Sequence, residues 1–168
     1  SVQGDIITSY TVHDGDTAIS VMQFAPDDSI LAIVEDGSDE TLLVDPVDGA
    51  ELLELTGHDG TILGLQFFAD STTLITSSND ASVLVWDTET GEIMDEYLHE
   101  IVVFNVALSP DETRFLSMPE DLSPQLWSLE QFTLEEAIAW ATENRLVRAL
   151  TEAECSRYTF VTYEDCED

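Results

Sequence analysis

Residues 57–87 read GHDGTILGLQFFADSTTLITSSNDASVLVWD. The stretch opens on Gly57-His58 and closes on Trp86-Asp87. Between these ends lie three short runs rich in β-branched and aromatic residues, separated by turn-forming residues. Such a pattern predicts antiparallel strands joined by tight turns. The three runs are Ile62–Phe67, Thr72–Thr76 and Val83–Trp86.

The same order of features recurs on both sides of this stretch. Phe24, Phe67 and Leu108 each end the first strand of a copy, so the copies are 43 and 41 residues apart. Trp127 likewise follows Trp86 by 41 residues. A period in the low forties with about four strands per unit is typical of a β-propeller, in which each repeat folds as one blade. We therefore expect an all-β, partial β-propeller of about three four-stranded antiparallel blades.

The chain after the third copy changes character. Leu134, Ile138 and Ala141 are spaced as one apolar stripe of a helix, and Thr133 is placed to cap its first turn. This pattern predicts a short helical C-terminal tail. The expected segments are 1–12 as the outer strand of a preceding blade, 13–56 as a degenerate first blade, 57–98 as the second blade, 99–129 as an incomplete third blade and 130–168 as the helical tail.

This arrangement resembles the WD-repeat family. In that family a histidine, a strand hydroxyl, a turn aspartate and a tryptophan form a buried hydrogen-bonded tetrad within a blade. The resemblance implies two such structural tetrads in this chain, and in the second of them Leu98 stands where the family has glycine. The two sets are His58, Thr76, Asp80 and Trp86 in the second copy, and His99, Ser117, Asp121 and Trp127 in the third.

The first copy departs from the family pattern. Ile33 stands at the hydroxyl position, Gly37 near the aspartate position and Val44 at the tryptophan position. We expect this blade to be held by apolar packing alone. Three blades do not close a propeller, which typically has four to eight. The resemblance is to bacterial WD-repeat proteins in which the last blade runs into a helical tail, and it implies the C-terminal fragment of a larger propeller.

The charge balance is strongly acidic. The chain has 36 acidic and four basic residues, no lysine and a net charge of −32. Such a charge repels nucleic acid and anionic lipid, which argues against both as partners. Two interpretations stay open: a solvating surface suited to high salt or an acidic setting, or an acidic face for a basic partner or calcium. The acids are spread along the whole chain, which favours the first.

Catalytic and ligand-binding motifs point to no enzyme class. Ser, His and Asp in one set raise the hypothesis of a hydrolase, but their recurrence once per repeat favours a structural role. We predict no catalytic, cofactor-binding or metal site. Cys155 and Cys166 leave two alternatives: a terminal disulfide if the protein is extracytoplasmic, or two ordinary thiols. We expect a cytoplasmic protein, or an extracytoplasmic one if a signal peptide precedes Ser1.

The function implied by the resemblance is a non-catalytic scaffold for protein–protein interaction. Its unknown protein partner would bind loops on one face of the propeller, and the remaining blades of the parent chain would pack on its ends. Two alternatives are carried along: a sensor or regulatory propeller attached to a signalling or NTPase effector domain, and a propeller-based hydrolase.

Overall fold

The computed structural model describes residues 17–129. The strand expected at residues 5–10, the helical tail expected over 130–168 and both cysteines lie outside this range. Within it, no helix capable of crossing a membrane is found.

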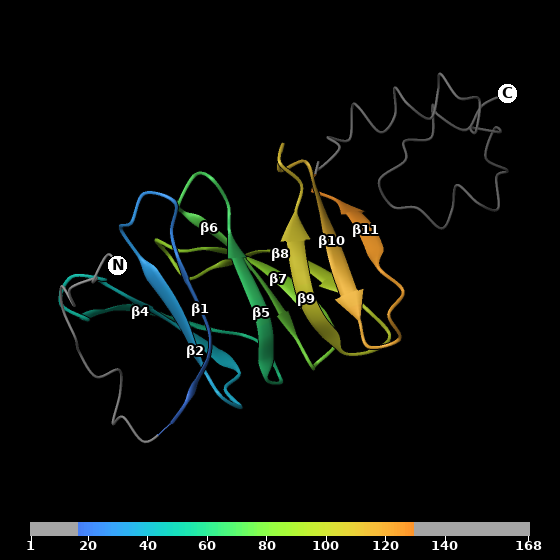
Figure 1. Ribbon diagram of the computed structural model, residues 1–168, viewed down its shortest axis with the longest axis horizontal. Helices are drawn as coiled ribbons and strands as arrows, with labels where there is room; N and C mark the ends of the chain where they lie inside the picture. Colours follow the sequence, from blue (N-terminus) through green and yellow to red (C-terminus); the bar gives the residue numbers. More distant parts are fainter. Residues whose placement is uncertain (1–16, 130–168) are drawn as a thin grey trace, which may run out of the picture. The chain divides into compact units, whose positions relative to one another are not determined.

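The described residues form three antiparallel sheets (Figure 1). Sheet 1 holds β1 (Ile19–Phe24), β2 (Leu31–Glu35), β3 (Glu40–Val44) and β4 (Glu51–Thr56); sheet 2 holds β5 (Ile62–Phe67), β6 (Thr73–Ser78), β7 (Ser82–Asp87) and β8 (Ile93–Leu98); sheet 3 holds β9 (Val103–Leu108), β10 (Arg114–Pro119) and β11 (Gln125–Ser128).

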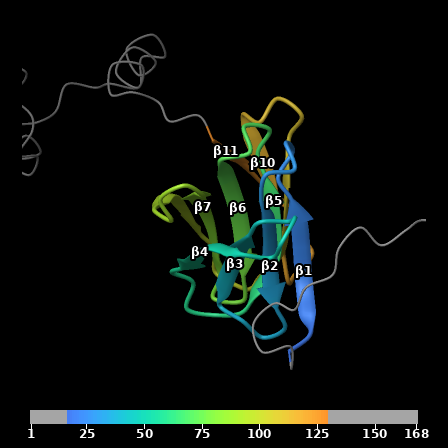
Figure 2. The same cartoon turned by 90° about the vertical axis from the view of Figure 1, so that its left-hand side faces the viewer.

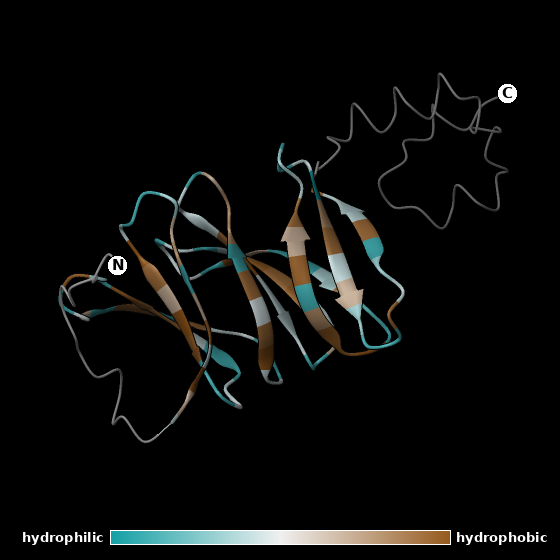
Figure 3. Ribbon diagram, in the orientation of Figure 1, coloured by the Kyte–Doolittle hydropathy of each residue, from teal (hydrophilic) through white to brown (hydrophobic). Residues whose placement is uncertain are grey.

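The predicted partial β-propeller is confirmed as the fold class. Strands that follow one another in the sequence pair with one another in every sheet, and short turns join them. Apolar residues lie along the strands and polar residues fill the turns (Figure 3). Sheet 3 has three strands in the described range, in the order β11-β10-β9, whereas sheets 1 and 2 have four each.

Two apolar cores join the three sheets. One lies between sheets 1 and 2 and contains Val34, Leu43, Leu74 and Trp86, all of them almost fully buried. The other lies between sheets 2 and 3 and contains Val83 and other buried apolar side chains. The first strands of the sheets, β1, β5 and β9, contact one another in that order (Figure 1). Figure 2 views the molecule from the side of sheet 1, whose strands β1 to β4 lie in sequence order. Sheet 2 thus packs one face on sheet 1 and the opposite face on sheet 3.

The turns repeat as closely as the strands. Asp28, Ser71 and Glu112 follow the first strands of sheets 1, 2 and 3, and all have positive φ, at 61°, 66° and 55°. Ala81 and Leu122 have positive φ after the second strands of sheets 2 and 3. L-residues seldom adopt this left-handed conformation. Because this conformation recurs at matching positions, the turns share one backbone conformation and join their strands in the same register.

Polar contacts link neighbouring sheets at equivalent points. The Phe67 N–H donates to the Gln23 side-chain oxygen at 3.1 Å, and the Leu108 N–H donates to that of Gln66 at 2.9 Å. In the turns, the Asp27 N–H donates to Ser71 Oγ at 3.2 Å. The Ala69 N–H donates in the same way to Glu112 Oε1 at 2.6 Å. These contacts supplement the apolar cores and define how one sheet sits on the next.

Gly64 is required where β5 approaches β9. A Cβ at this position would lie 2.7 Å from Asn105 Oδ1, 2.9 Å from Ser77 Oγ and 3.1 Å from Asn105 Cα. Contacts below 3.0 Å force a shift, and the nearby Cα belongs to the backbone of the neighbouring sheet.

We therefore expect Gly64→Ala to lower the free energy of unfolding by about 1–3 kcal/mol, the usual cost of overpacking. Urea denaturation followed by circular dichroism measures the change. The control is Gly37→Ala, since a Cβ there meets no atom within 4 Å and the cost comes only from its φ of 84°. A Gly64→Ala variant as stable as the parent would show that β5 and β9 are not in close contact.

Candidate functional site

The polar side chains predicted for the second copy meet inside sheet 2. His58 lies just after β4, Thr76 on β6, Asp80 in the turn after β6 and Trp86 on β7. His58 Nδ1 is 2.8 Å from Asp80 Oδ2, and His58 Nε2 is 2.8 Å from Thr76 Oγ1. The Trp86 Nε1–H donates to the same Thr76 oxygen at 2.8 Å. The four side chains therefore form one continuous hydrogen-bonded chain.

The protonation of this chain follows from its chemistry. An ionised Asp80 only accepts, so His58 Nδ1 carries the proton that it donates to the carboxylate. Neutral Nε2 then accepts the Thr76 hydroxyl proton, and the hydroxyl oxygen accepts from the indole. Burial lowers the pKa of His58, while its contact with Asp80 partly opposes this shift. Each polar atom of the set therefore has a partner with the imidazole neutral.

Asp80 has a second role as the anchor of its turn. Burial opposes its ionisation, but hydrogen bonds from Ser82 and His58 outweigh this effect and lower the pKa of its carboxyl group. The Ser82 N–H and hydroxyl donate to Asp80 Oδ1 at 2.8 and 2.7 Å. The Asp59 N–H donates to Oδ2 at 2.9 Å. Asp80 consequently ties the turn before β7 to the loop that contains His58.

Gly57 makes room for the tryptophan of this set. A Cβ on Gly57 would lie 2.9 Å from Ile93 Cδ1 and 3.0 Å from the six-membered ring of Trp86. Trp86 is only 1% exposed, and His58 lies edge-on to it with ring centroids 6.1 Å apart. The Gly-His pair in the sequence thus reflects a steric need for glycine and a polar need for histidine.

Sheet 3 brings together three of the four residues predicted for it. His99 Nε2 is 2.8 Å from Ser117 Oγ, to which the Trp127 Nε1–H donates at 2.9 Å. Asp121 does not reach the histidine. It accepts instead from the N–H and hydroxyl of Ser123. His99 Nδ1 is buried and has no hydrogen-bond partner among the described residues.

A substitution in the preceding strand accounts for the difference at Asp121. In sheet 2, Ser78 Oγ donates to the Gly60 carbonyl at 2.9 Å and accepts the Asp80 N–H at 3.1 Å. These bonds hold the aspartate turn against the histidine loop. Pro119 occupies the matching position in sheet 3, between Ser117 and Asp121, and has neither a hydroxyl nor an N–H. The turn of sheet 3 lacks this link, and its aspartate is exposed.

The first copy has no polar set. Ile33 and Val44 stand at its hydroxyl and tryptophan positions and are 2% and 1% exposed. They form a cluster with Leu31 and Leu42 on the face of sheet 1 that points away from sheet 2. Gly37 lies in the turn after β2, with φ of 84°.

Two groups of contacts were not predicted from the sequence. Ser82 hydrogen-bonds to Asp80 and lies 3.0 Å from His58 Nδ1, so it belongs to the polar set of sheet 2. The matching Ser123 shows that the signal was a serine two residues after each turn aspartate. Gln23 and Gln66 link neighbouring sheets, and both directly precede the phenylalanine that ends the first strand. Their 43-residue spacing equals that of the two phenylalanines.

Many aspartates of the described range build turns. Their carboxylates accept backbone or hydroxyl hydrogens from residues two or three positions later, as in Asx-turns. Such bonds from Ser29 lower the pKa of Asp27. The pKa of Asp111 is lowered by the hydroxyl of Ser109, two residues earlier, and by Thr113, two residues later. Much of the acidity of the loops therefore has a local structural use. The aspartates are Asp27, Asp45, Asp48, Asp70, Asp80, Asp87, Asp111 and Asp121.

Self-repulsion among these charges predicts a strong salt effect. We expect the melting temperature to rise as NaCl is increased from about 20 mM to about 1 M, because the Debye length falls from tens of ångströms to about 3 Å. Differential scanning calorimetry across the series measures the rise. A melting temperature independent of NaCl would mean that the net charge of −32 is not a significant cost to the folded state.

Potential metal-ligating side chains do not cluster in the described part of the chain. Within residues 17–129, no group of three or more His, Cys, Asp or Glu side chains is arranged to hold a metal ion. A small hollow on sheet 1 is lined by Glu35, Glu40 and Glu54 over a floor of Ile33 and Leu42. This hollow contains no residue of the polar sets of sheets 2 and 3.

Comparisons with known proteins agree with the repeat. Residues 49–87 match the family described as WD domain, G-beta repeat. This segment begins just before β4 and ends with β7, so it joins the outer strand of one sheet to three strands of the next. No curated protein sequence matches the chain.

Solved structures share the fold. The β-propeller domain of Cps50 (Swd1) from Myceliophteria thermophila is similar, with a TM-score of 0.62 and 19% sequence identity. The similarity covers 67% of this chain and 36% of that one, so the chain spans about a third of that structure. Residues 49–87 thus match a WD repeat, and the described residues share the β-propeller fold.

Proposed function

We propose that the chain is a non-catalytic scaffold that binds a protein partner through its loops. A WD repeat on a propeller fold is in general consistent with a scaffold for protein interaction. For this chain, the proposal rests on one observation, which is where the side chains that could act in catalysis lie. His58, Thr76 and Asp80 hydrogen-bond to one another inside a sheet rather than facing a cleft.

The same geometry argues against hydrolysis by this set. Thr76 is fully buried and His58 is 5% exposed, so a substrate carbonyl has no path to the hydroxyl. The Thr76 oxygen also already accepts the indole N–H of Trp86, which competes for the lone pair that a nucleophile needs. A nucleophile must instead be able to approach its substrate at about 3 Å. The arrangement suits the holding of strands in register.

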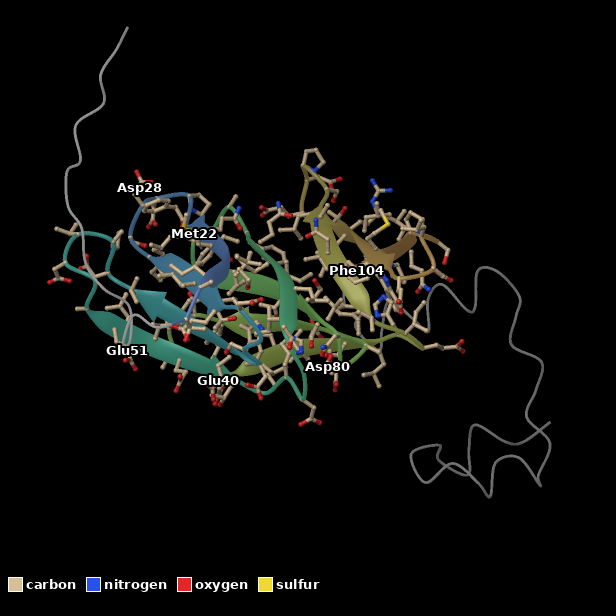
Figure 4. The ribbon with its side chains drawn as sticks, turned by 60° about the horizontal axis from the view of Figure 1, so that its bottom comes forward. Met22, Asp28, Glu40, Glu51, Asp80 and Phe104 are labelled. Atoms are coloured by element: carbon tan, nitrogen blue, oxygen red, sulfur yellow. The ribbon has the colours of Figure 1, made fainter. Side chains whose placement is uncertain are left out.

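The loops at the two ends of the strands are the surfaces left for a partner. One end carries the turns after the first and third strands of each sheet, including Glu89 and Glu92. The other end carries the turns after the second strands and the connections between sheets, including Asp59 and Glu120. Asp28 and Asp80, which are labelled in Figure 4, belong to the first and the second end respectively. We propose that one of these two ends binds the partner.

Charge-reversal variants at each end test this proposal. The first variant is Glu89→Lys/Glu92→Lys, the second is Asp59→Lys/Glu120→Lys, and the control is Glu54→Lys on β4. Purified tagged chains are used to capture proteins from an extract of the source cells, and quantitative mass spectrometry compares the captured proteins. We expect one loop variant to lose a partner that the control keeps, with all three melting temperatures close to the parent value. A partner captured equally by all variants would rule out recognition by these loop charges. An enzymatic activity that His58→Ala abolishes without unfolding the chain would refute the proposal of a non-catalytic scaffold.

A further inference from the structure

One ring nitrogen of His99 distinguishes the polar set of sheet 3 from that of sheet 2. His99 Nδ1 is buried and has no hydrogen-bond partner among the described residues. In sheet 2 the equivalent atom, His58 Nδ1, lies 2.8 Å from Asp80 Oδ2. Asp121 holds the position of Asp80 in sheet 3, but its side chain is exposed and accepts from Ser123. The polar set of sheet 3 is therefore open at one contact.

The turn that carries Asp121 has the same backbone arrangement as its counterpart in sheet 2. The Glu120 N–H donates to the Val102 carbonyl, in the connection before β9, at 3.0 Å. The Asn79 N–H donates in the same way to the Thr61 carbonyl, before β5, at 3.0 Å. The residue after each aspartate has positive φ, 59° in sheet 3 and 70° in sheet 2. A rotation of the Asp121 side chain, with the backbone in place, therefore separates the open arrangement from the closed one of sheet 2.

Protonation of His99 changes the balance between these two arrangements. Burial lowers the pKa of His99, and a contact with the Tyr97 backbone partly opposes this shift. Hydrogen bonds from Ser123 lower the pKa of Asp121, so its carboxylate stays charged while the histidine titrates. A hydrogen bond between imidazolium and carboxylate is charge-assisted and about twice as strong as one between neutral groups. A partly buried charge without a partner is also costly, so protonated His99 favours the closed arrangement more than neutral His99 does.

The elements around His99 hold other charged groups as well. His99 follows β8, lies against Trp127 of β11 with ring centroids 4.9 Å apart, and donates its N–H to the Ala81 carbonyl in the turn before β7. Among the acidic residues of these elements, Asp121 is the one at the position from which Asp80 binds the histidine of sheet 2. The charged and titratable side chains are Asp95, Glu96 and Tyr97 on β8, Asp80 before β7, Glu100 beside His99, Arg114 on β10, and Glu120 and Asp121 after it.

We propose that the turn between β10 and β11 (Figure 1) is a pH-sensitive switch. In acid, His99 takes up a proton, and the Asp121 carboxylate leaves Ser123 and accepts the hydrogen bond from His99 Nδ1. At neutral pH the carboxylate returns to Ser123. The closed turn withdraws one carboxylate from the loops at the second end of the strands, so acid changes the surface of that end. The switch is independent of the proposed function, because its test needs no partner.

Nuclear magnetic resonance of the isotope-labelled chain follows both parts of the switch. The titration runs from about pH 8 to about pH 4 in about 1 M NaCl, which screens exposed charges much more than a partly buried pair. The ring nitrogens of His99 report its protonation, and the Ser123 amide reports whether Asp121 is bound to it. We expect the Ser123 amide resonance to move with the same midpoint as the His99 ring.

Removing the Asp121 carboxylate tests the contact itself. Asp121→Asn is expected to lower the pKa of His99, because the imidazolium loses its charged partner. Glu120→Gln is the matched control, since it removes the same charge from the adjacent exposed residue, and it should leave the titration of His99 close to that of the parent chain. Pro119→Ser supplies the hydroxyl that Ser78 has in sheet 2, so it should favour the closed turn and raise the pKa of His99.

Three results would overturn the switch. A His99 titration that Asp121→Asn and Glu120→Gln change equally would mean that nearby charge acts without a contact. A Ser123 amide whose midpoint differs from that of His99 would show that the turn does not follow the histidine. A His99 ring that stays neutral until the chain unfolds would show that the folded chain has no protonated form for the turn to close on.

Discussion

Replacing Trp86 with alanine is expected to lower the free energy of unfolding by about 3–5 kcal/mol, which is the usual cost of truncating a fully buried large aromatic residue. Trp86 is 1% exposed and lies in the core between sheets 1 and 2. Its ring fills the space that Gly57 leaves open. Its removal also leaves the Thr76 oxygen without the indole donor. Guanidinium denaturation followed by far-ultraviolet circular dichroism measures the loss.

Trp127→Ala is the matched control for this result. Trp127 occupies the equivalent position in sheet 3 and donates to Ser117, but it is only partly buried. Less area is removed from water there, so the cost should be clearly smaller than at Trp86. Equal costs at the two positions would mean that the core between sheets 1 and 2 does not dominate the stability of the fold.

His58→Ala is expected to destabilise the fold at neutral pH and to weaken its response to acid. The substitution leaves the buried Thr76 hydroxyl without the acceptor of its proton and removes a donor to Asp80, at a cost of about 1–3 kcal/mol. Because the pKa of His58 is lowered in the folded state, the unfolded chain takes up a proton first as the pH falls. The stabilisation by neutral His58 is therefore complete above about pH 6.5 and is lost as the pH falls toward the folded pKa.

Asp80 acts in the same direction at lower pH. Its pKa lies below 3.8 in the folded state, so its contribution is present above that value and is lost as the pH falls through the folded pKa. Melting temperatures measured between about pH 3 and pH 8 in about 1 M NaCl, which screens the repulsion among the carboxylates, should thus fall in two stages for the parent chain. His58→Ala should flatten the upper stage.

His99→Ala is the control for the pH experiment. Burial lowers the pKa of His99 too, and a contact with the Tyr97 backbone partly opposes this shift. Among the described residues His99 lacks an aspartate partner, and it is only partly buried. We expect it to cost less than His58→Ala and to retain most of the upper stage. A parent chain whose stability is the same at pH 5 and pH 8 would contradict a neutral, buried His58.

The recurring strand pattern was sufficient to predict the fold class. Ile62–Phe67 and Val83–Trp86 were expected as strands; the first is β5 and the second lies within β7. Apolar runs and turn residues recur at matched spacing because equivalent strands of each copy bury equivalent side chains, so the pattern predicts the strands directly. The expected Thr72–Thr76 run is β6, Thr73–Ser78, whose end extends over two serines that no apolar pattern marks.

The contacts that side chains make were harder to predict than the positions of the strands. Asp80 and Asp121 have the same spacing to their histidines, but only Asp80 makes the contact. The difference arises from Ser78 and Pro119, which control how the turn is tied down rather than which residue stands in it. The Gln23 and Gln66 contacts join separate sheets, so they depend on packing that one strand does not reveal.

The central claim is that the polar set of sheet 2 is one cooperative structural network. A double-mutant cycle on Thr76 and Trp86 tests it most directly, because their side chains are joined by a 2.8 Å hydrogen bond. The unfolding free energies of Thr76→Val, Trp86→Phe and the double variant are compared with that of the parent chain. The network predicts a coupling energy within about 0.5–3 kcal/mol, with the double variant less destabilised than the sum of the single variants. Strictly additive losses would contradict the account.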